Sequence, residues 1–234
     1  MRIVFVRHGH PDYATDSLVE IGKIQAEVVA KRLEDEGISE IYSSTMGRAM
    51  ETAAPFSKNT GLPVTGLDFM REITWGSNSG AELPYNGHPW NALPEIVKSG
   101  ISISDSNWER NPFAEGNDKL KKSVKRVTEG FDNWLSGFGY VRDGEYYRVE
   151  NGSYSDKTIV LFNHGGASTV VLSHMLNMPF LSACLFLRPY FTAVTVISLE
   201  GNEGDLIIPR IEILNDDRHV PKSSDGKIEN KVDK

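Results

Sequence analysis

The residues most suited to chemistry stand where the first apolar segment of the chain ends. The apolar run of residues 3–6 is followed directly by Arg7, His8, Gly9 and His10. Such a run is too short for a buried helix, so it predicts a buried strand. Packing alone gives no reason for a buried strand to end in a cation and two imidazoles. These side chains are therefore candidates for a binding or catalytic site.

Three later predicted strands also end in polar side chains. Arg48 comes just after the second strand, Glu72 follows the third, and His164 and Gly165 follow a strand at residues 158–162. In an open α/β sheet, ligands bind beyond the carboxyl ends of the strands, where helix N-termini also meet. Guanidinium groups bind phosphate oxygens in pairs, and helix N-termini add N–H donors. The combination predicts a local anion pocket that fits a phosphate dianion.

The elements that position these residues alternate between strands and helices. The predicted order is β, α, β, α, β, an insertion, α, β, α, β, β, which favours a three-layer α/β/α sandwich with a mostly parallel sheet. Helices are expected from a capping box at Ser17 and Glu20, from Thr45 with a break at Pro55, at residues 118–135, and up to Met175. Hairpins are expected around Asp143-Gly144 and between the strands Thr192–Leu199 and Leu206–Leu214.

The segment from residue 76 to residue 157 is predicted to be an insertion that caps the site. Its first part, residues 76–116, is rich in Gly, Pro, Ser and Asn, and is expected to form an irregular wall opposite the polar cluster. We expect one domain over residues 1–214, with this cap inside it, and a polar tail over residues 215–234.

Composition and charge limit the kinds of partner. The chain has 234 residues and a formal net charge of −7, which argues against a nucleic-acid or anionic-membrane surface. The single cysteine, Cys184, stands among apolar neighbours, so a buried, inert thiol is expected and an internal disulfide is excluded. No apolar stretch has the length of a membrane span and no signal peptide is evident, so a cytoplasmic location is expected by default. The oligomeric state stays open.

Four motifs give the chain a strong resemblance to the histidine phosphatase superfamily and its phosphoglycerate mutase-like fold. They are VRHG near the N-terminus, the helical IGKIQA, then YSSTMGRAMETA, and finally FNHGG. RHG alone is a weak signal, but the motifs in this order and spacing are specific. The resemblance covers residues 1–75 and about 157–200, and the segment between them resembles no known family.

This resemblance implies a role for each charged candidate. It implies that His8 is the nucleophile and becomes a phosphohistidine. Arg7, Arg48 and His164 would hold the phosphoryl oxygens. Glu72 resembles the carboxylate that donates a proton to the leaving group. The physical chemistry agrees, because neighbouring cations disfavour the protonated imidazole and meet the charge on the transferred group. With those cations present, no metal or other cofactor is expected.

The positions around the predicted substrate site match the family's usual residues less closely. Gly9, His10, Gly165 and Trp75 are assigned to substrate binding, with plain solvent exposure as the alternative for His10. Asn163 stands where Ser or Thr is common before the later His-Gly. The run WGSNSG replaces the Gly-x-Trp-Glu-Gly of many small-molecule phosphatases. The substrate is therefore not named by the sequence.

The sequence thus predicts a metal-independent phosphomonoester hydrolase of the histidine acid phosphatase type, acting on a small phosphorylated metabolite. A mutase-type phosphotransferase is an alternative, although the charged pattern and the Glu-Arg-x-Tyr-Gly run of mutases are missing. A catalytically silent module that binds phospho-ligands is a second one. A metal-dependent hydrolase built on His8 and His10 is a third, disfavoured because Arg7 and Arg48 would repel a cation.

Overall fold

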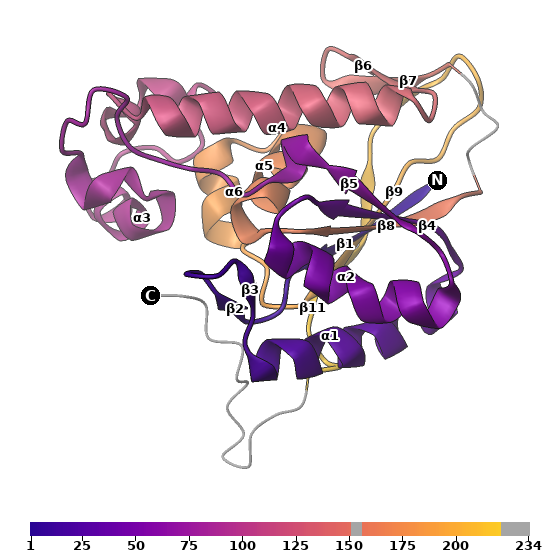
Figure 1. Ribbon diagram of the computed structural model, residues 1–234. Helices are drawn as coiled ribbons and strands as arrows, with labels where there is room; N and C mark the ends of the chain where they lie inside the picture. Colours follow the sequence, from indigo (N-terminus) through magenta and orange to yellow (C-terminus); the bar gives the residue numbers. More distant parts are fainter. Residues whose placement is uncertain (151–155, 221–234) are drawn as a thin grey trace.

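The computed structural model describes residues 1–150 and 156–220, and its centre is a six-stranded sheet (Figure 1). The strands lie in the order β11-β9-β1-β8-β4-β5. Four of them are parallel: β1 (Arg2–Arg7), β8 (Thr158–Asn163), β4 (Ile38–Ser44) and β5 (Val64–Leu67). Two run antiparallel at one edge: β9 (Val194–Ser198) and β11 (Arg210–Asp216). The mostly parallel sheet agrees with the predicted fold class.

Helices cover both faces of the sheet and complete three layers (Figure 1). One face carries α1 (Glu20–Arg32) and α2 (Gly47–Thr60), and the other carries α4 (Asp118–Ser136), α5 (Gly165–Met175) and α6 (Phe180–Phe186). In β1, Ile3 and Phe5 belong to the apolar cluster on the α4 and α5 side, whereas Val4 and Val6 belong to the cluster on the α1 and α2 side. Both faces of β1 are buried, which explains why residues 3–6 are all apolar.

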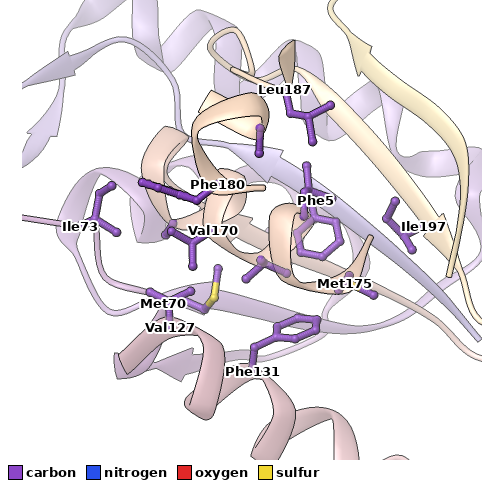
Figure 2. Packing of buried hydrophobic residues seen from close by; sticks show 14 of the residues in the cluster. Phe5, Met70, Ile73, Val127, Phe131, Val170, Met175, Phe180, Leu187 and Ile197 are labelled. Atoms are coloured by element: carbon purple, nitrogen blue, oxygen red, sulfur yellow. The ribbon is translucent and has the colours of Figure 1, made fainter. Parts of the chain in front are cut away.

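The apolar cluster on the α4 and α5 side extends to the predicted proton donor. Figure 2 shows Phe5 of the sheet packed with Phe131 of α4 and Val170 of α5, and Ile73 at the margin of the same cluster. Ile73 is 2% exposed, and it directly follows Glu72. The backbone beside Glu72 is therefore anchored in the core.

Several predicted elements are confirmed. The amphipathic helix at residues 118–135 is α4, and the hairpin around Asp143-Gly144 consists of β6 (Tyr140–Asp143) and β7 (Tyr146–Val149). Cys184 is buried, and burial raises the pKa of its thiol. Short 3₁₀ helices at Glu34–Glu36 and Asp68–Met70 follow α1 and β5. Among the helices of the described residues, none is both long enough and apolar enough to cross a membrane.

The capping box predicted at Ser17 and Glu20 is wrong. Helix α1 begins at Glu20 with Val19 as its N-cap, and no side chain caps it. Residues Ser17–Leu18 instead form β3, which pairs with β2 (Pro11–Asp12). Ser17 pairs with Asp12 in this ladder and lies two residues before the N-cap, so its hydroxyl is not at the capping position.

The break predicted at Pro55 is also wrong. Helix α2 runs from Gly47 to Thr60 with Pro55 inside it, and Gly61 ends it in the left-handed conformation as expected. Proline removes one helical hydrogen bond. The buried Ala53 and Phe56 on either side of Pro55 hold the helix against the sheet, so tertiary packing outweighs the lost bond.

The segment at residues 76–116 is more regular than predicted. It contains α3 (Pro89–Lys98) and 3₁₀ helices at Pro84–Gly87, Trp108–Arg110 and Pro112–Ala114. Helix α3 begins with a His88 cap and a proline in its first turn, and it buries Leu93 and Ile96. These signals were masked by the high content of loop-forming residues around them. Helix α6 was not predicted at all.

The C-terminal hairpin is only partly as predicted. Strand β11 pairs with β9, but β10 (Leu206–Ile207) leaves this pairing and joins β7 in a second sheet, in the order β10-β7-β6. Strand β11 continues to Asp216, so residues 215–216 belong to the sheet rather than to a tail. The part of the predicted tail from residue 221 on lies outside the described residues.

Candidate active site

The parallel strands bring the predicted catalytic residues to one edge of the sheet. His8 follows β1 and His164 follows the neighbouring β8, and their ring centroids lie 5.1 Å apart. Arg48 reaches the same point from the first turn of α2. Arg7, the most exposed of these four side chains, shows only 6% of its surface to solvent. Two cations and two imidazoles are thus buried together, as the sequence predicts.

His8 is held as a neutral imidazole with one defined tautomer. Its Nδ1 lies 2.7 Å from the Gly9 carbonyl oxygen, which can only accept, so Nδ1 carries the hydrogen. Its Nε2 accepts a hydrogen bond from Arg48 Nε at 3.2 Å. Burial, and then the Arg7 charge, lower the pKa of His8 well below its usual value. Nε2 is therefore unprotonated, and its lone pair points at the Arg48 guanidinium group.

Asp16 orients Arg48, and no sequence pattern indicates this contact. Arg48 Nη1 donates to Asp16 Oδ1, and the Gly47 amide donates to Asp16 Oδ2 at 2.8 Å. Asp16 lies in the polar loop between β2 and β3, with a φ of 52°. One carboxylate thereby fixes both the first turn of α2 and its guanidinium group. Nothing in the loop sequence distinguishes Asp16 from Asp12, so only the fold reveals this contact.

Arg7 is positioned by the segment before β9. Its Nη1 donates to the Pro189 carbonyl oxygen at 3.0 Å, and its Cζ lies 4.0 Å from the centroid of the Phe191 ring. Phe191 is fully buried, so it gives the guanidinium a fixed apolar surface to stack on. The backbone of Gly165 approaches Arg7 from the other strand end, and a Cβ there would lie 3.3 Å from Arg7 Nε.

His164 is neutral as well. Its Nε2 lies 2.8 Å from the hydroxyl oxygen of Ser44, at the end of β4. Burial, and then the neighbouring His8, lower the pKa of His164 well below its usual value. Ser44 belongs to the YSS part of a quoted motif, but the sequence did not single it out as a partner of His164.

Glu72 lies at the N-terminus of α5. Its two carboxylate oxygens accept the amides of Gly166 at 3.1 Å and Ala167 at 2.9 Å, and Oε1 also accepts the Ile73 amide at 2.9 Å. Arg126 of α4 donates to the Glu72 carbonyl oxygen at 3.2 Å and so holds the backbone at this position. The start of α5 therefore holds both oxygens of the Glu72 side chain in place.

The predicted substrate-binding residues are placed differently from one another. Trp75 and Gly165 line a cavity of about 360 Å³ that Arg7 and Glu72 also line, whereas His8, Arg48 and His164 are not among its lining residues. Gly9 and His10 do not line it. A Cβ at Gly9 would lie 2.6 Å from the Gly22 carbonyl oxygen, so Gly9 permits a close contact between two backbones. The His10 ring lies 5.0 Å from the Phe191 ring.

The cavity also contains residues that sequence reasoning missed. Its lining consists of Arg7, Tyr13, Glu72, Trp75, His88, Trp90, Gly165, Gly166 and Arg188. Tyr13 comes from the loop after β2, His88 and Trp90 from the start of α3, and Arg188 from the segment after α6. Trp108, by contrast, packs on Phe180 in the core, with ring centroids 4.8 Å apart. The expected wall opposite the histidines therefore comes from only part of residues 76–116.

The sequence profile of the histidine phosphatase superfamily (branch 1) matches residues 3–210. The chain belongs to this superfamily. The match runs through the segment between residues 76 and 157, so the expectation that this segment resembles no known family is wrong.

Solved structures of two phosphatases share the fold of this chain. A mycobacterial glucosyl-3-phosphoglycerate phosphatase is 22% identical with a TM-score of 0.62, covering 92% of this chain and 98% of its own. A phosphoserine phosphatase from Entamoeba histolytica is 20% identical with a TM-score of 0.62, covering 93% and 98%. At these identities the likeness concerns the fold.

Curated relatives match a shorter stretch. A probable phosphatase of Schizosaccharomyces pombe is 31% identical over 90 residues, which are 34% of this chain and 43% of the relative. A probable phosphoglycerate mutase GpmB of Yersinia pestis is 34% identical over 85 residues, 32% of this chain and 40% of the relative. The matched stretch thus spans less than half the length of either relative.

Proposed function

We propose that the chain is a phosphoric monoester hydrolase that acts through a phosphohistidine on His8. The observation that carries this proposal is the buried, neutral His8, whose Nε2 lone pair faces Arg48 Nε at 3.2 Å beside a cavity lined by Arg7. A neutral imidazole is a nucleophile, and the two guanidinium groups are suited to hold the oxygens of the phosphoryl group under attack.

The reaction has two displacements. In the first, His8 Nε2 forms a bond to phosphorus while the bond from phosphorus to the ester oxygen breaks, and the leaving oxygen takes a proton from the Glu72 carboxyl group. In the second, water attacks phosphorus, the P–N bond breaks, and Glu72 takes a proton from the water. Phosphate leaves and both residues return to their starting states. Arg7 and Arg48 stabilise the charge on the equatorial oxygens in both steps.

Rapid-quench labelling tests the nucleophile. A generic aryl phosphate carrying ³²P should leave an acid-labile, base-stable label on the wild-type protein, and His8→Ala should show neither label nor turnover. His174→Gln serves as the matched control, because its ring hydrogen-bonds Asp132 at the other end of α5. Near-normal kcat in His8→Ala would refute the assignment.

Metal independence is part of the proposal. Buried Arg7 and Arg48 beside the histidines would repel a divalent cation. Activity should persist in EDTA, and vanadate should inhibit by forming a trigonal-bipyramidal adduct on His8. Loss of activity in EDTA that zinc or manganese restores would favour the metal-hydrolase alternative.

The finer assignment to the histidine acid phosphatase type is a further part of the proposal. It is supported by the lowered pKa of His8, because the imidazole then keeps its lone pair on the acid side of neutrality. A pH–rate profile of kcat/KM that stays high below pH 6 would agree with it, whereas a steep fall below pH 7 would oppose it. We also propose a small phosphorylated metabolite as substrate and a cytoplasmic location.

A mutase-type phosphotransferase is the second candidate, and the likeness to a probable phosphoglycerate mutase favours it. In that case the phosphohistidine would pass its phosphoryl group to another hydroxyl group instead of water. Phosphorus NMR of the protein incubated with 3-phosphoglycerate separates the two outcomes, since a mutase yields an isomeric ester and a phosphatase yields inorganic phosphate.

A further inference from the structure

The two ring nitrogens of His164 have different surroundings. Its Nε2 lies 2.8 Å from the Ser44 hydroxyl oxygen, whereas its Nδ1 is buried and has no hydrogen-bond partner among the residues that the structure describes. The ring belongs to the same cluster as His8, with centroids 5.1 Å apart, and the charges of Arg48 and Arg7 act on it. Nδ1 is therefore the ring nitrogen that remains for a ligand of this cluster.

The Ser44 hydroxyl determines which of these nitrogens carries the hydrogen. Its oxygen accepts the Met46 amide at 3.3 Å, so the turn that leads into α2 uses one of its lone pairs. Among the described residues, His164 Nε2 is the acceptor that its O–H reaches. Burial, and then the neighbouring His8, lower the pKa of His164, so the ring is neutral and carries one hydrogen. If Nε2 accepts from Ser44, that hydrogen must sit on Nδ1.

The opposite tautomer leaves more polar groups unsatisfied. With the hydrogen on Nε2, the Ser44 oxygen accepts twice, its own O–H meets no acceptor in the described part of the chain, and the Nδ1 lone pair is buried without a donor. With the hydrogen on Nδ1, the Nδ1–H is the one group of the pair that lacks a partner. Buried polar groups in folded proteins are normally hydrogen-bonded, and an exception indicates a functional or solvent partner. An anion oxygen can accept from this N–H.

Ser44 is held rigidly in the position that this contact needs. It is the last residue of β4 and is fully buried. Strand β4 pairs in parallel with β8, and Ser43 lies opposite Phe162, so the register places Ser44 beside the end of β8 that leads to His164. A buried hydroxyl held between a strand end and the Met46 amide cannot turn towards water.

We propose that Ser44 is a positioning residue that fixes His164 as its Nδ1–H tautomer, and that this N–H donates to an oxygen of phosphate or of the phosphoryl group on His8. The identity of the anion rests on the proposed function. Arg7 and Arg48 supply the positive charge of the cluster, and His164 adds a neutral donor with a fixed direction. A donor that is oriented before the anion arrives costs no reorganisation when charge develops on the oxygen.

Nitrogen NMR of the histidine side chains reads the tautomer without turnover. The chain has six histidines, so the spectrum of ¹⁵N-histidine-labelled wild-type protein is compared with that of His164→Gln to assign the His164 signals. In mildly alkaline solution we expect the hydrogen on Nδ1 and a bare Nε2. Inorganic phosphate, added as the probe, should shift the Nδ1–H resonance and leave Nε2 without a hydrogen.

Serine variants test whether Ser44 sets the tautomer. Ser44→Ala removes the donor, so His164 should populate both tautomers, and the dissociation constant of phosphate measured by calorimetry should rise about 3- to 30-fold. Ser44→Thr keeps the hydroxyl and should restore the Nδ1–H form and most of the affinity. Ser43→Ala is the matched control, because it removes the same atom from the neighbouring buried serine, whose hydroxyl donates to the Ser44 carbonyl oxygen at 2.9 Å. It should keep the wild-type tautomer and affinity.

The outcomes separate this inference from the proposed function. Wild-type protein with the hydrogen on Nε2 overturns the inference whether or not the variants fold, and so does phosphate that binds without shifting the Nδ1–H resonance. A folded Ser44→Ala with the Nδ1–H form alone and with the phosphate affinity of Ser43→Ala overturns the role of Ser44. If tautomer and affinity behave as expected but no phosphate ester is hydrolysed, the anion contact stands and the phosphatase proposal fails.

Discussion

Replacing Asp16 by Asn tests the geometry around His8 most directly. Asp16 bonds Arg48 Nη1 through Oδ1 and the Gly47 amide through Oδ2. Asparagine keeps the shape of the side chain and can still accept the Gly47 amide, but it removes the negative charge that orients the guanidinium. Arg48 would keep its contact with His8 without a fixed direction.

The size of the effect follows from the burial of the two partners. A hydrogen bond to a charged group is worth about 1.5–3 kcal/mol, whereas an exposed ion pair is worth about 0.2–1 kcal/mol. The Arg48 side chain is 5% exposed and that of Asp16 is 38% exposed, so the pair lies between these cases. We expect Asp16→Asn to cost about 1–2 kcal/mol of transition-state stabilisation, or roughly 5- to 30-fold in kcat/KM.

The assay compares kcat/KM on an aryl phosphate with the inhibition constant of inorganic phosphate. Loss of orientation should lower kcat, while loss of a negative charge should leave phosphate affinity unchanged or make it tighter. Asp12→Asn is the control, because Asp12 ends β2 just before the loop that carries Asp16 and accepts the Ala14 amide at 2.9 Å. Unchanged kcat in Asp16→Asn, or an equal loss in Asp12→Asn, would refute the reasoning.

Three other predictions concern the same cluster. Glu72→Gln should lower kcat/KM about 10²- to 10⁴-fold for alkyl phosphates but much less for nitrophenyl phosphate, because only a basic leaving oxygen needs the proton. The same change in kcat/KM on both substrates would exclude proton donation. Gly166→Ala should lower the free energy of unfolding in urea by about 1–3 kcal/mol, since its Cβ would lie 2.5 Å from Ile73 Cγ1; an unchanged midpoint would contradict the packing argument. The pKa values of His8 and His164 are lowered in the folded state, so the unfolded chain binds more protons than the folded chain below about pH 6.5. The melting temperature should therefore fall as the pH drops from about 6.5 towards the lowered pKa values. A melting temperature that stays constant over this range would refute the prediction.

The parts of the site that follow strands could be predicted because strand geometry is local. An apolar run marks a strand, and parallel neighbours place their carboxyl ends side by side, so Arg7, His8 and His164 were found from the sequence. The contacts of Asp16 and Arg188 could not be found in this way. Each depends on a loop meeting an element more than 30 residues away, as with the 32 positions between Asp16 and Arg48.

Local signals also failed where tertiary packing or another partner competed with them. The capping box at Ser17 failed because Ser17 pairs with Asp12 in the β2–β3 ladder, two residues before the N-cap Val19. The break at Pro55 failed because the helix on both sides of it is packed on the sheet. The start of α3 did carry its signals, a His88 cap and Pro89. They were outweighed by the glycine, serine and asparagine content of residues 76–116, which indicated a loop.

The two glycines after His164 show how a motif can be recognised before its cause is known. From the sequence, Gly165 and Gly166 indicate a turn, yet both lie in the first turn of α5 and neither has a positive φ. Their cause is space. A Cβ at Gly165 would lie 3.3 Å from Arg7 Nε, and one at Gly166 would lie 2.6 Å from Glu72 Oε1. The absence of side chains thus lets the start of α5 meet the Arg7 guanidinium on one side and the Glu72 carboxylate on the other. The amides of Gly166 and Ala167 can then bind the Glu72 carboxylate directly, which a larger residue at position 166 would prevent.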